Sequence, residues 1–254
     1  MTIPNNHIID LTDITFLIPV RIDSDQRNNN LSILLNLLNR DFETNVIVLE
    51  ADKKQLYVPP KEIKNLKYFF IHDEDEIFYR TRYINQMIAM SSTPYIAVWD
   101  TDAIAAPGQI ADAVTALRNQ VAVMAFPFDG RFYEVSGTLY NLFCITLKFE
   151  ALLNNLNLMP LRYGYNMVGG AFMVNREKYI TAGMENEIFY GWGDEDNERV
   201  KRMEVLGLPI YRAQGPLFHL WHQRGQNSWF ANRETEIRNK REFLKTCSRK
   251  MVNF

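Results

Sequence analysis

Two alternating hydrophobic patterns along residues 14–126 constrain the fold most strongly. Short apolar runs rich in β-branched and aromatic residues alternate with segments whose apolar residues recur at helical spacing. Strands that alternate with helices in this way build parallel βαβ units. We therefore expect an α/β fold with a mostly parallel central sheet and flanking helices. The expected strands are residues 14–20, 45–50, 66–71, 95–99 and 121–126, and the expected helices are 31–38, 79–90 and 109–117.

The second half of the chain is less regular. Residues 128–160 are rich in aromatic side chains and predict a largely helical insertion. The other expected elements are a strand at 167–174, a helix at 194–206, short strands at 209–212 and 217–221, and a charged helix from residue 232. Neither an internal repeat nor a Gly/Ser linker interrupts the sequence, so we expect one domain over residues 1–254.

The charge balance excludes some classes of partner. The 28 basic and 30 acidic residues give a net charge of −2, which argues against a nucleic-acid-binding protein. The hydrophobic fraction of 47% argues against a disordered chain. Basic residues nevertheless outnumber acidic ones after Ala231. This tail is either an ordinary solvated helix or a segment attracted to an anionic membrane surface.

Compartment is predicted from three weaker signals. Cys144 and Cys247 have neither metal-type nor disulfide-framework spacing, which favours a reducing compartment. The first 13 residues have no basic start followed by an apolar core, so they do not resemble a signal peptide. No apolar run approaches the roughly 18 residues that span a bilayer. We expect a cytoplasmic protein, with attachment to the inner face of the membrane as an open alternative.

Polar side chains follow the expected strands at the edge where α/β sheets bind ligands. Pro19, Val20 and Arg21 end the first strand, and Glu50 ends the second. Asp100-Thr-Asp102 follows a strand that is apolar throughout. Two carboxylates one residue apart suit a hard cation such as Mg²⁺ or Mn²⁺ and its bound phosphates. The alternative for this motif is an ordinary turn, because Asp is a common turn residue.

Two of the four histidines lie close together, at His219 and His222. At a turn both imidazoles face one site, whereas on a continuous strand they point to opposite faces. The pair predicts one or two metal ligands, with a structural histidine as the alternative for each. Neither has a C-x-x-C partner, so a structural zinc site is not expected.

Gly191-Trp192-Gly193 precedes an acidic run that includes Asp194, Glu195 and Asp196. Acidic residues at a helix start complement the helix dipole, which is the simpler explanation for Asp194. An aromatic ring between two glycines suggests an exposed turn that stacks on a sugar. A neighbouring carboxylate is suited to act as a general base.

These motifs together resemble a known family. The segment 169–179, with its Gly-Gly start, and the later Phe-Tyr-Gly-Trp-Gly-Asp-Glu-Asp at 189–196 resemble the C-terminal signature of β-1,4-galactosyltransferases. They are also similar to chondroitin-polymerase-type and polypeptide N-acetylgalactosaminyltransferase domains. The chain departs from the galactosyltransferase pattern at Val20, Asp194 and Asn197. The resemblance covers most of residues 14–225 and implies a GT-A fold. In such a fold a Rossmann-like nucleotide half (about 14–126) joins an acceptor half (about 127–230), here followed by the basic tail, 231–254.

The resemblance also implies roles for individual residues. It implies a metal-dependent transfer of a hexose or N-acetylhexosamine, of the galactose or N-acetylgalactosamine type, from a UDP-sugar to a glycan or lipid-linked hydroxyl, with inversion in one displacement. Mn²⁺, or alternatively Mg²⁺, would be bound by Asp102, His222 and His219. The donor would contact Pro19, Val20, Arg21, Glu50, Asp100, Gly170 and Trp192, with Arg82 and Asn85 as supporting residues. Asp196 would be the base and Glu195 would hold sugar hydroxyls, although these two roles are interchangeable.

Two other functions compete with this one. A phosphohydrolase of the haloacid-dehalogenase type also places Asp-x-Asp after an apolar strand, but it has the motif in its first strand. A non-catalytic GT-A-like partner subunit that binds carbohydrate or nucleotide sugar is the other alternative. Together, the missing signal peptide and membrane anchor fit a bacterial enzyme of polysaccharide synthesis better than a Golgi enzyme.

Overall fold

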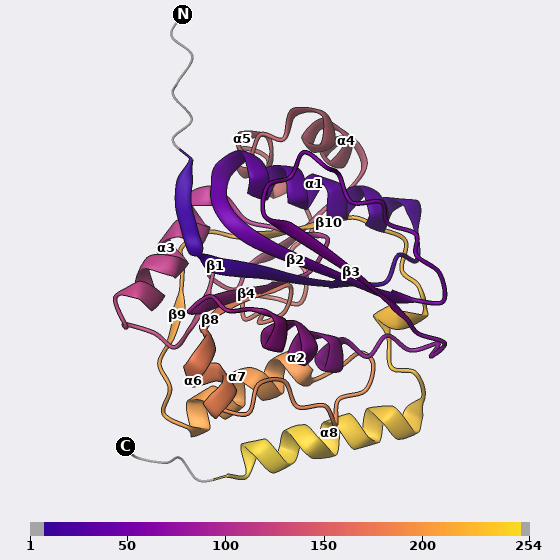
Figure 1. Ribbon diagram of the computed structural model, residues 1–254, viewed down its shortest axis with the longest axis vertical. Helices are drawn as coiled ribbons and strands as arrows, with labels where there is room; N and C mark the ends of the chain where they lie inside the picture. Colours follow the sequence, from indigo (N-terminus) through magenta and orange to yellow (C-terminus); the bar gives the residue numbers. More distant parts are fainter. Residues whose placement is uncertain (1–7, 250–254) are drawn as a thin grey trace, which may run out of the picture.

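The computed structural model describes residues 8–249, and its main feature is a seven-stranded sheet with the order β3-β2-β1-β4-β8-β6-β9 (Figure 1). The strands are β1 (Ile9–Val20), β2 (Phe42–Asp52), β3 (Leu66–His72), β4 (Tyr95–Trp99), β6 (Met124–Phe126), β8 (Ala171–Asn175) and β9 (Ile210–Arg212). Only β8 runs against its neighbours β4 and β6, while the other pairs are parallel. The expected mostly parallel α/β sheet is confirmed.

Helices cover both faces of this sheet. The three helices of the first half are α1 (Asp25–Asp41), α2 (Arg80–Met90) and α3 (Pro107–Arg118). Figure 1 shows α1 on one face of the sheet and α2 on the opposite face. Leu31, Leu34, Leu35 and Leu38 of α1 are buried against the sheet, because helical spacing places them on one side. Strand β4 is apolar throughout and residues 14–20 of β1 are all buried, as expected for central strands that helices cover on both faces.

A second, three-stranded sheet joins distant parts of the chain. Its order is β5 (Ala103–Ile104), β10 (Leu217–Leu220) and β7 (Phe132–Val135). Pairing of β10 with β5 sets His219 opposite Ala103, directly after the Asp100–Asp102 turn. This pairing brings the late histidines to the carboxyl end of β4. Local periodicity does not predict it, because the two strands are more than a hundred residues apart.

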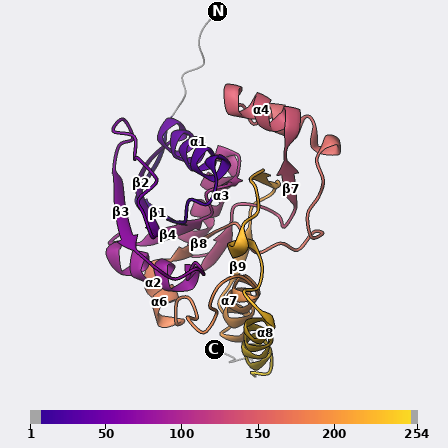
Figure 2. The ribbon, with the colours of Figure 1, turned by 90° about the vertical axis from the view of Figure 1, so that its right-hand side faces the viewer.

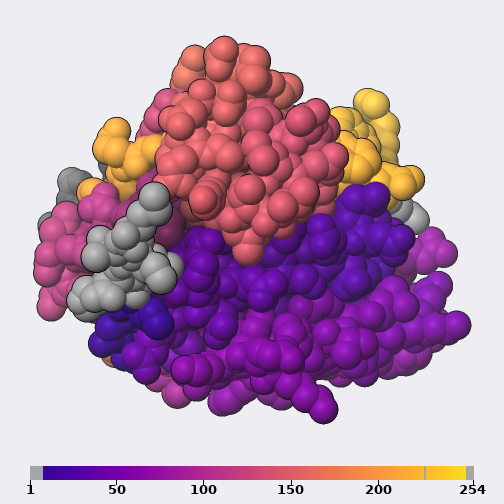
Figure 3. Space-filling view, turned by 90° about the horizontal axis from the view of Figure 1, so that it is seen from above, coloured from indigo at the N-terminus to yellow at the C-terminus, as the bar shows by residue number. Residues whose placement is uncertain are grey.

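The predicted insertion is largely helical, as expected. After β7 it contains α4 (Gly137–Thr146), α5 (Glu150–Leu153) and the short helix η1 (Leu156–Leu158). In the space-filling view these residues form a dome that projects above the first half of the chain (Figure 3). The expected strand at 167–174 begins later, at Ala171, because the Gly pair before it adopts a loop in which Gly170 has φ +90°.

The last part of the chain consists of α6 (Arg176–Thr181), α7 (Glu195–Val205), η2 (Gln226–Ser228) and α8 (Arg233–Cys247). Helices α7 and α8 pack side by side below the sheet (Figure 2). Asn232 caps α8, since its side chain accepts a hydrogen bond from the Thr235 amide. Within residues 8–249, no helix combines the length and the apolar character needed to cross a membrane.

Candidate active site

One cavity of about 530 Å³ lies at the carboxyl ends of β1 and β4, as the sheet topology predicts. Its walls come from the end of β1, the Asp100–Asp102 turn, the loop before β8, the start of α7 and the segment after β10. These predicted residues line it: Pro19, Val20, Arg21, Asp100, Asp102, Gly170, Trp192, Glu195, Asp196, His219 and His222.

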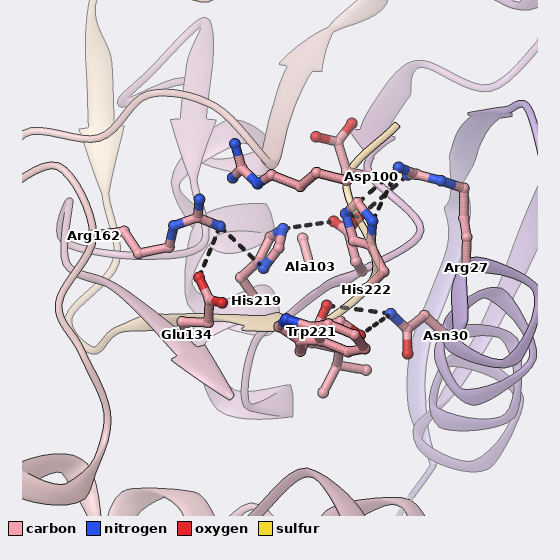
Figure 4. Close-up of polar contacts among 12 residues, drawn as sticks. Arg27, Asn30, Asp100, Ala103, Glu134, Arg162, His219, Trp221 and His222 are labelled. Carbon is pink, nitrogen blue, oxygen red and sulfur yellow. Dashed lines mark hydrogen bonds and ion pairs between the residues drawn. The ribbon is translucent and has the colours of Figure 1, made fainter. Parts of the chain in front are cut away.

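Asp102, His219 and His222 form a compact buried group within this cavity. Asp102 Oδ2 lies 3.0 Å from His222 Nε2, and Asp102 Oδ1 lies 3.8 Å from His219 Nε2. Both imidazoles reach the same carboxylate because β10 ends at Leu220, so His222 is on the following loop. Figure 4 shows the two rings side by side (Figure 4). One carboxylate and two imidazoles are a donor set that fits a divalent transition-metal ion.

The protonation states of Asp102 and His219 favour metal binding. Burial alone would raise the pKa of Asp102, but the charges of His219, His222 and Arg27 outweigh it and hold that pKa well below its usual range. Burial lowers the pKa of His219 and so favours its neutral form. The Nδ1 of His222 lies 2.8 Å from the Gln223 carbonyl, which turns Nε2 toward Asp102.

His222 differs from His219 in the balance of these effects. Burial lowers the pKa of His222, but its hydrogen bond to Asp102 and the charge of that carboxylate raise it further, so the net shift is upward. Protons and a metal ion would therefore compete for His222.

Asp196 is held by two arginines. Arg199 Nη1 donates to Asp196 Oδ1 at 2.7 Å, and Arg80 Nη1 lies 3.8 Å from the same oxygen. Arg199 is fully buried and is itself anchored by Glu185 at 2.7 and 2.8 Å. Arg80 Nη2 also donates to Asp100 Oδ1 at 2.7 Å. The two arginines therefore fix the position of Asp196 relative to the Asp100–Asp102 turn.

Glu195 lies beside Asp196 in a different environment. Burial, with a smaller contribution from the charge of Asp196, raises the pKa of Glu195 to about 7. Its Oε2 accepts a hydrogen bond from the Gly193 amide at 2.9 Å. A carboxyl group with this pKa exchanges protons near neutral pH, which suits acid–base chemistry.

Aromatic rings border the cavity next to these carboxylates. Trp192 is stacked on Trp229, with ring centroids 5.5 Å apart, and meets Phe230 edge to face. The ring of Trp192 is partly exposed, as expected for a residue between Gly191 and Gly193.

The two glycines before β8 lie too close to neighbouring side chains to carry a Cβ atom. A Cβ on Gly169 would lie 2.6 Å from Asp196 Oδ2, and one on Gly170 would lie 2.9 Å from the Leu217 side chain. The Gly170 carbonyl also accepts a hydrogen bond from the Asp100 amide at 2.8 Å. These two glycines allow the Asp196 carboxylate and the metal motif to approach each other.

Three predicted residues do not line the cavity. Glu50 is fully buried, and its carboxylate accepts hydrogen bonds from the Leu56 and Tyr57 amides and the Tyr68 hydroxyl. Arg82 is exposed and packs over Tyr79, and Asn85 bonds to Glu185 and Glu187. The structure gives these three residues contacts within the protein in place of the predicted nucleotide contacts.

Arg21 lines the cavity in a supporting position. Its guanidinium donates to the carbonyls of Ala51, Asp75 and Glu76, and to the Asp73 carboxylate. These bonds fix the acidic loop after β3 beside the cavity.

Six charged residues of the cavity were not predicted: Asp23, Arg27, Arg80, Arg162, Arg224 and Lys240. For α2, the sequence interpretation selected Arg82, whereas Arg80 lies on the side of the helix that faces the site. Residues two apart on a helix point away from each other, so the choice depends on how the helix is rotated. The sequence offered one weak signal for Arg80: it is the first residue of the helix that follows β3, so it lies near the edge of the sheet where the cavity forms.

Comparison with known proteins agrees with this architecture. Residues 151–223 match a family model described as the N-terminal domain of galactosyltransferase. Human β-1,4-galactosyltransferase 7 is 24% identical over 233 residues, which cover 87% of this chain and 61% of the human protein. The chain therefore resembles galactosyltransferases over part of its length. It thus spans about three fifths of the length of this relative.

Solved GT-A structures show the same fold. A Drosophila β-1,4-galactosyltransferase 7 mutant in complex with manganese, UDP-Gal and xylobiose has a TM-score of 0.53 and 17% identity, covering 97% of this chain and 82% of the other. Glucosyl-3-phosphoglycerate synthase from Mycobacterium tuberculosis, in complex with Mn²⁺, UDP and phosphoglyceric acid, has a TM-score of 0.51 and 14% identity, with coverages of 92% and 78%.

Proposed function

We propose that this protein is a metal-dependent glycosyltransferase that uses a UDP-sugar donor. It transfers a hexose or N-acetylhexosamine, of the galactose or N-acetylgalactosamine type, to the hydroxyl of a glycan or glycolipid with inversion. The observation that carries the proposal is the meeting, in one cavity, of the Asp102–His219–His222 group and the Glu195–Asp196 pair. The Drosophila complex with manganese, UDP-Gal and xylobiose supports the donor and acceptor classes.

The metal would be Mn²⁺, or alternatively Mg²⁺, held by Asp102, His219 and His222. When bound, it supplies a Lewis acid that offsets the negative charge of the departing diphosphate. The buried carboxylate and the neutral His219 are suited to this ligand set.

Donor and acceptor would be positioned by the walls of the cavity. Pro19, Val20 and Asp100 border the end nearest β1 and β4, where the nucleotide would lie. Gly170 lines the cavity in the loop before β8, and Trp192 offers a partly exposed ring to the sugars. We place the nucleotide half at about residues 14–126 and the acceptor half at about 127–230 of a single domain.

Asp196 would take the proton from the acceptor hydroxyl as that oxygen attacks the anomeric carbon and the bond to the diphosphate breaks. Arg80 and Arg199 hold its carboxylate in place, and Glu195 would hold sugar hydroxyls next to it. The pKa of Glu195, about 7, makes it the alternative base.

The outer face of α8 is a candidate for attachment to a membrane. Arg233, Ile237, Arg241 and Leu244 follow one another along this face, and all four are exposed. The buried face carries Thr235, Asn239, Glu242 and Thr246. We propose that this basic and apolar face attaches the protein to anionic lipid, where a lipid-linked acceptor would be available.

A screen of UDP-sugars with and without Mn²⁺ tests the proposed function. We expect sugar release or transfer that requires the metal, and a loss of at least about a hundredfold in the Asp102→Ala variant, since several kcal/mol of charge stabilisation disappears. Glu62→Ala, at an exposed glutamate outside the cavity, is the matched control. Donor binding without turnover by the wild type would favour the non-catalytic alternative.

Two further variants in the same assay assign the base. Asp196→Asn should abolish transfer and keep UDP binding, because the amide cannot accept the proton. Glu195→Gln should weaken transfer less. The reverse ranking would assign the base to Glu195.

A further inference from the structure

Arg27 is a cavity residue that the proposed mechanism does not use. It lies in the first turn of α1, where its amide donates to the Ser24 side chain at 3.2 Å. Asn30, one turn later, donates to the carbonyls of Leu220 and Trp221 at 3.2 and 3.3 Å. These bonds fix α1 against the segment that carries both histidines, so the Arg27 side chain reaches the metal group (Figure 4).

The guanidinium of Arg27 contacts two of the three proposed metal ligands. Nη1 lies 3.4 Å from Asp102 Oδ2, and Nη2 lies 3.3 and 3.5 Å from the two ring nitrogens of His222. The same Asp102 oxygen is the one that faces His222 Nε2 at 3.0 Å. A cation bound between Asp102 and His222 would therefore share a carboxylate oxygen with Arg27.

We infer that Arg27 competes with the divalent cation for Asp102, and that a diphosphate in the cavity removes this competition. A buried carboxylate needs a positive partner, and two cations at one carboxylate repel each other. Asp23 Oδ1 accepts from Arg27 Nε at 2.8 Å and anchors the side chain at its base. This anchor keeps the guanidinium in the cavity when a cation displaces it from Asp102. Its two Nη atoms would then be available to phosphate oxygens, which match the geometry of the guanidinium fork.

This inference rests on the proposed function and adds regulation of its metal site. Metal and donor would bind with positive coupling. A metal ion at Asp102 would displace Arg27 and make its guanidinium available to the diphosphate, and a diphosphate that binds Arg27 would leave Asp102 available to the metal ion. By thermodynamic linkage, UDP would raise the affinity for Mn²⁺ by the same factor as Mn²⁺ raises the affinity for UDP.

Mn²⁺ titrations monitored by electron paramagnetic resonance, with and without UDP, test the inference without any measurement of turnover. In Arg27→Gln, we expect Mn²⁺ alone to bind about tenfold tighter than in the wild type, and the tightening by UDP to shrink by a similar factor. Arg27→Lys keeps the charge and should remain closer to the wild type. Arg224→Gln, at an exposed arginine of the same cavity, controls for a general loss of positive charge. Circular dichroism of each variant confirms folding.

The possible outcomes distinguish a failure of the Arg27 role from a failure of the metal site itself. If the wild type binds Mn²⁺ and Arg27→Gln binds it no tighter without UDP, the role of Arg27 is wrong and the metal site remains. An equal gain in Arg224→Gln would also contradict it, since any lost charge would then suffice. Absence of Mn²⁺ binding in every variant, with and without UDP, would overturn the metal site together with this inference.

Discussion

Glu195 shows how strongly the surroundings of one residue set its chemistry. It neighbours Asp196 in sequence and lines the same cavity, yet burial raises its pKa from an ordinary 4.5 to about 7. Between these two values the folded protein binds a proton that the unfolded chain has released. The free energy of unfolding must therefore fall as the pH rises through this window.

Replacement of Glu195 by its neutral isostere should remove this pH dependence. We expect Glu195→Gln to gain about 2 kcal/mol of stability relative to the wild type between about pH 5 and pH 8. Urea unfolding of both proteins at the two pH values measures the difference. Glu204→Gln, at an exposed glutamate of α7, is the control for loss of a carboxylate from the same helix. A stability difference that is equal at both pH values would show that Glu195 is ionised throughout.

At the scale of elements, α8 supports the turn that carries Trp192. Asn239 is fully buried, and its side-chain amide donates to the Gly193 carbonyl at 3.2 Å. A Cβ on Gly193 would lie 2.2 Å from the Phe230 ring, so the segment before α8 packs directly on this turn. The helix thus holds the aromatic wall of the cavity in place from outside.

Removal of the Asn239 amide should affect both stability and the cavity. We expect Asn239→Ala to lower the free energy of unfolding by about 1–3 kcal/mol, because the Gly193 carbonyl loses its buried donor. Tryptophan fluorescence should also change, since Trp192 and Trp229 would no longer hold their stacked arrangement. Arg241→Gln, at an exposed position on the outer face of α8, should leave both unchanged. A variant with wild-type stability and fluorescence would mean that α8 does not support the turn.

The elements that were predictable from the sequence are those with local hydrophobic patterns. Strand β4 and the leucine face of α1 follow directly from their apolar spacing. The pairing of β10 with β5 does not, since it depends on contacts between segments far apart in the chain.

Strand-end position correctly placed Asp102 in the cavity, and the close spacing of the two histidines correctly placed His222 there. Strand-end position was insufficient for Glu50, because a nearby loop supplies its partners. These signals also missed Arg27, which reaches Asp102 only through the orientation of α1.

In the molecule as a whole, α8 and the segment before it form part of the cavity wall. Phe230, just before α8, and Lys240, within it, line the same cavity as the proposed metal ligands. Tyr163 also lines that cavity and is 61% exposed, while Trp229, stacked on Trp192, is 66% exposed. Exposed aromatic rings and a basic helix therefore lie on connected parts of the surface. Such a surface suits an acceptor held in a lipid layer, because the enzyme would meet the membrane near the opening of its own cavity.

This arrangement predicts binding to anionic vesicles. We expect the wild type to co-sediment with vesicles containing phosphatidylserine and to be released by salt, because basic residues supply most of the attraction. Reversal of two charges on the outer face, Arg233→Glu with Arg241→Glu, should weaken this binding at least about tenfold. Lys61→Glu with Lys67→Glu makes the same charge change at exposed positions outside α8.

The comparison between the two pairs of variants shows whether α8 itself or the total charge of the protein causes vesicle binding. If both pairs lose binding equally, the attraction reflects total charge and α8 is an ordinary solvated helix. If the α8 pair alone loses binding, the apolar contribution can be measured next with Leu244→Ala, since Leu244 is 63% exposed on the same face of α8 as Arg241. Binding that survives reversal of both α8 charges would contradict the assignment of this face to the membrane.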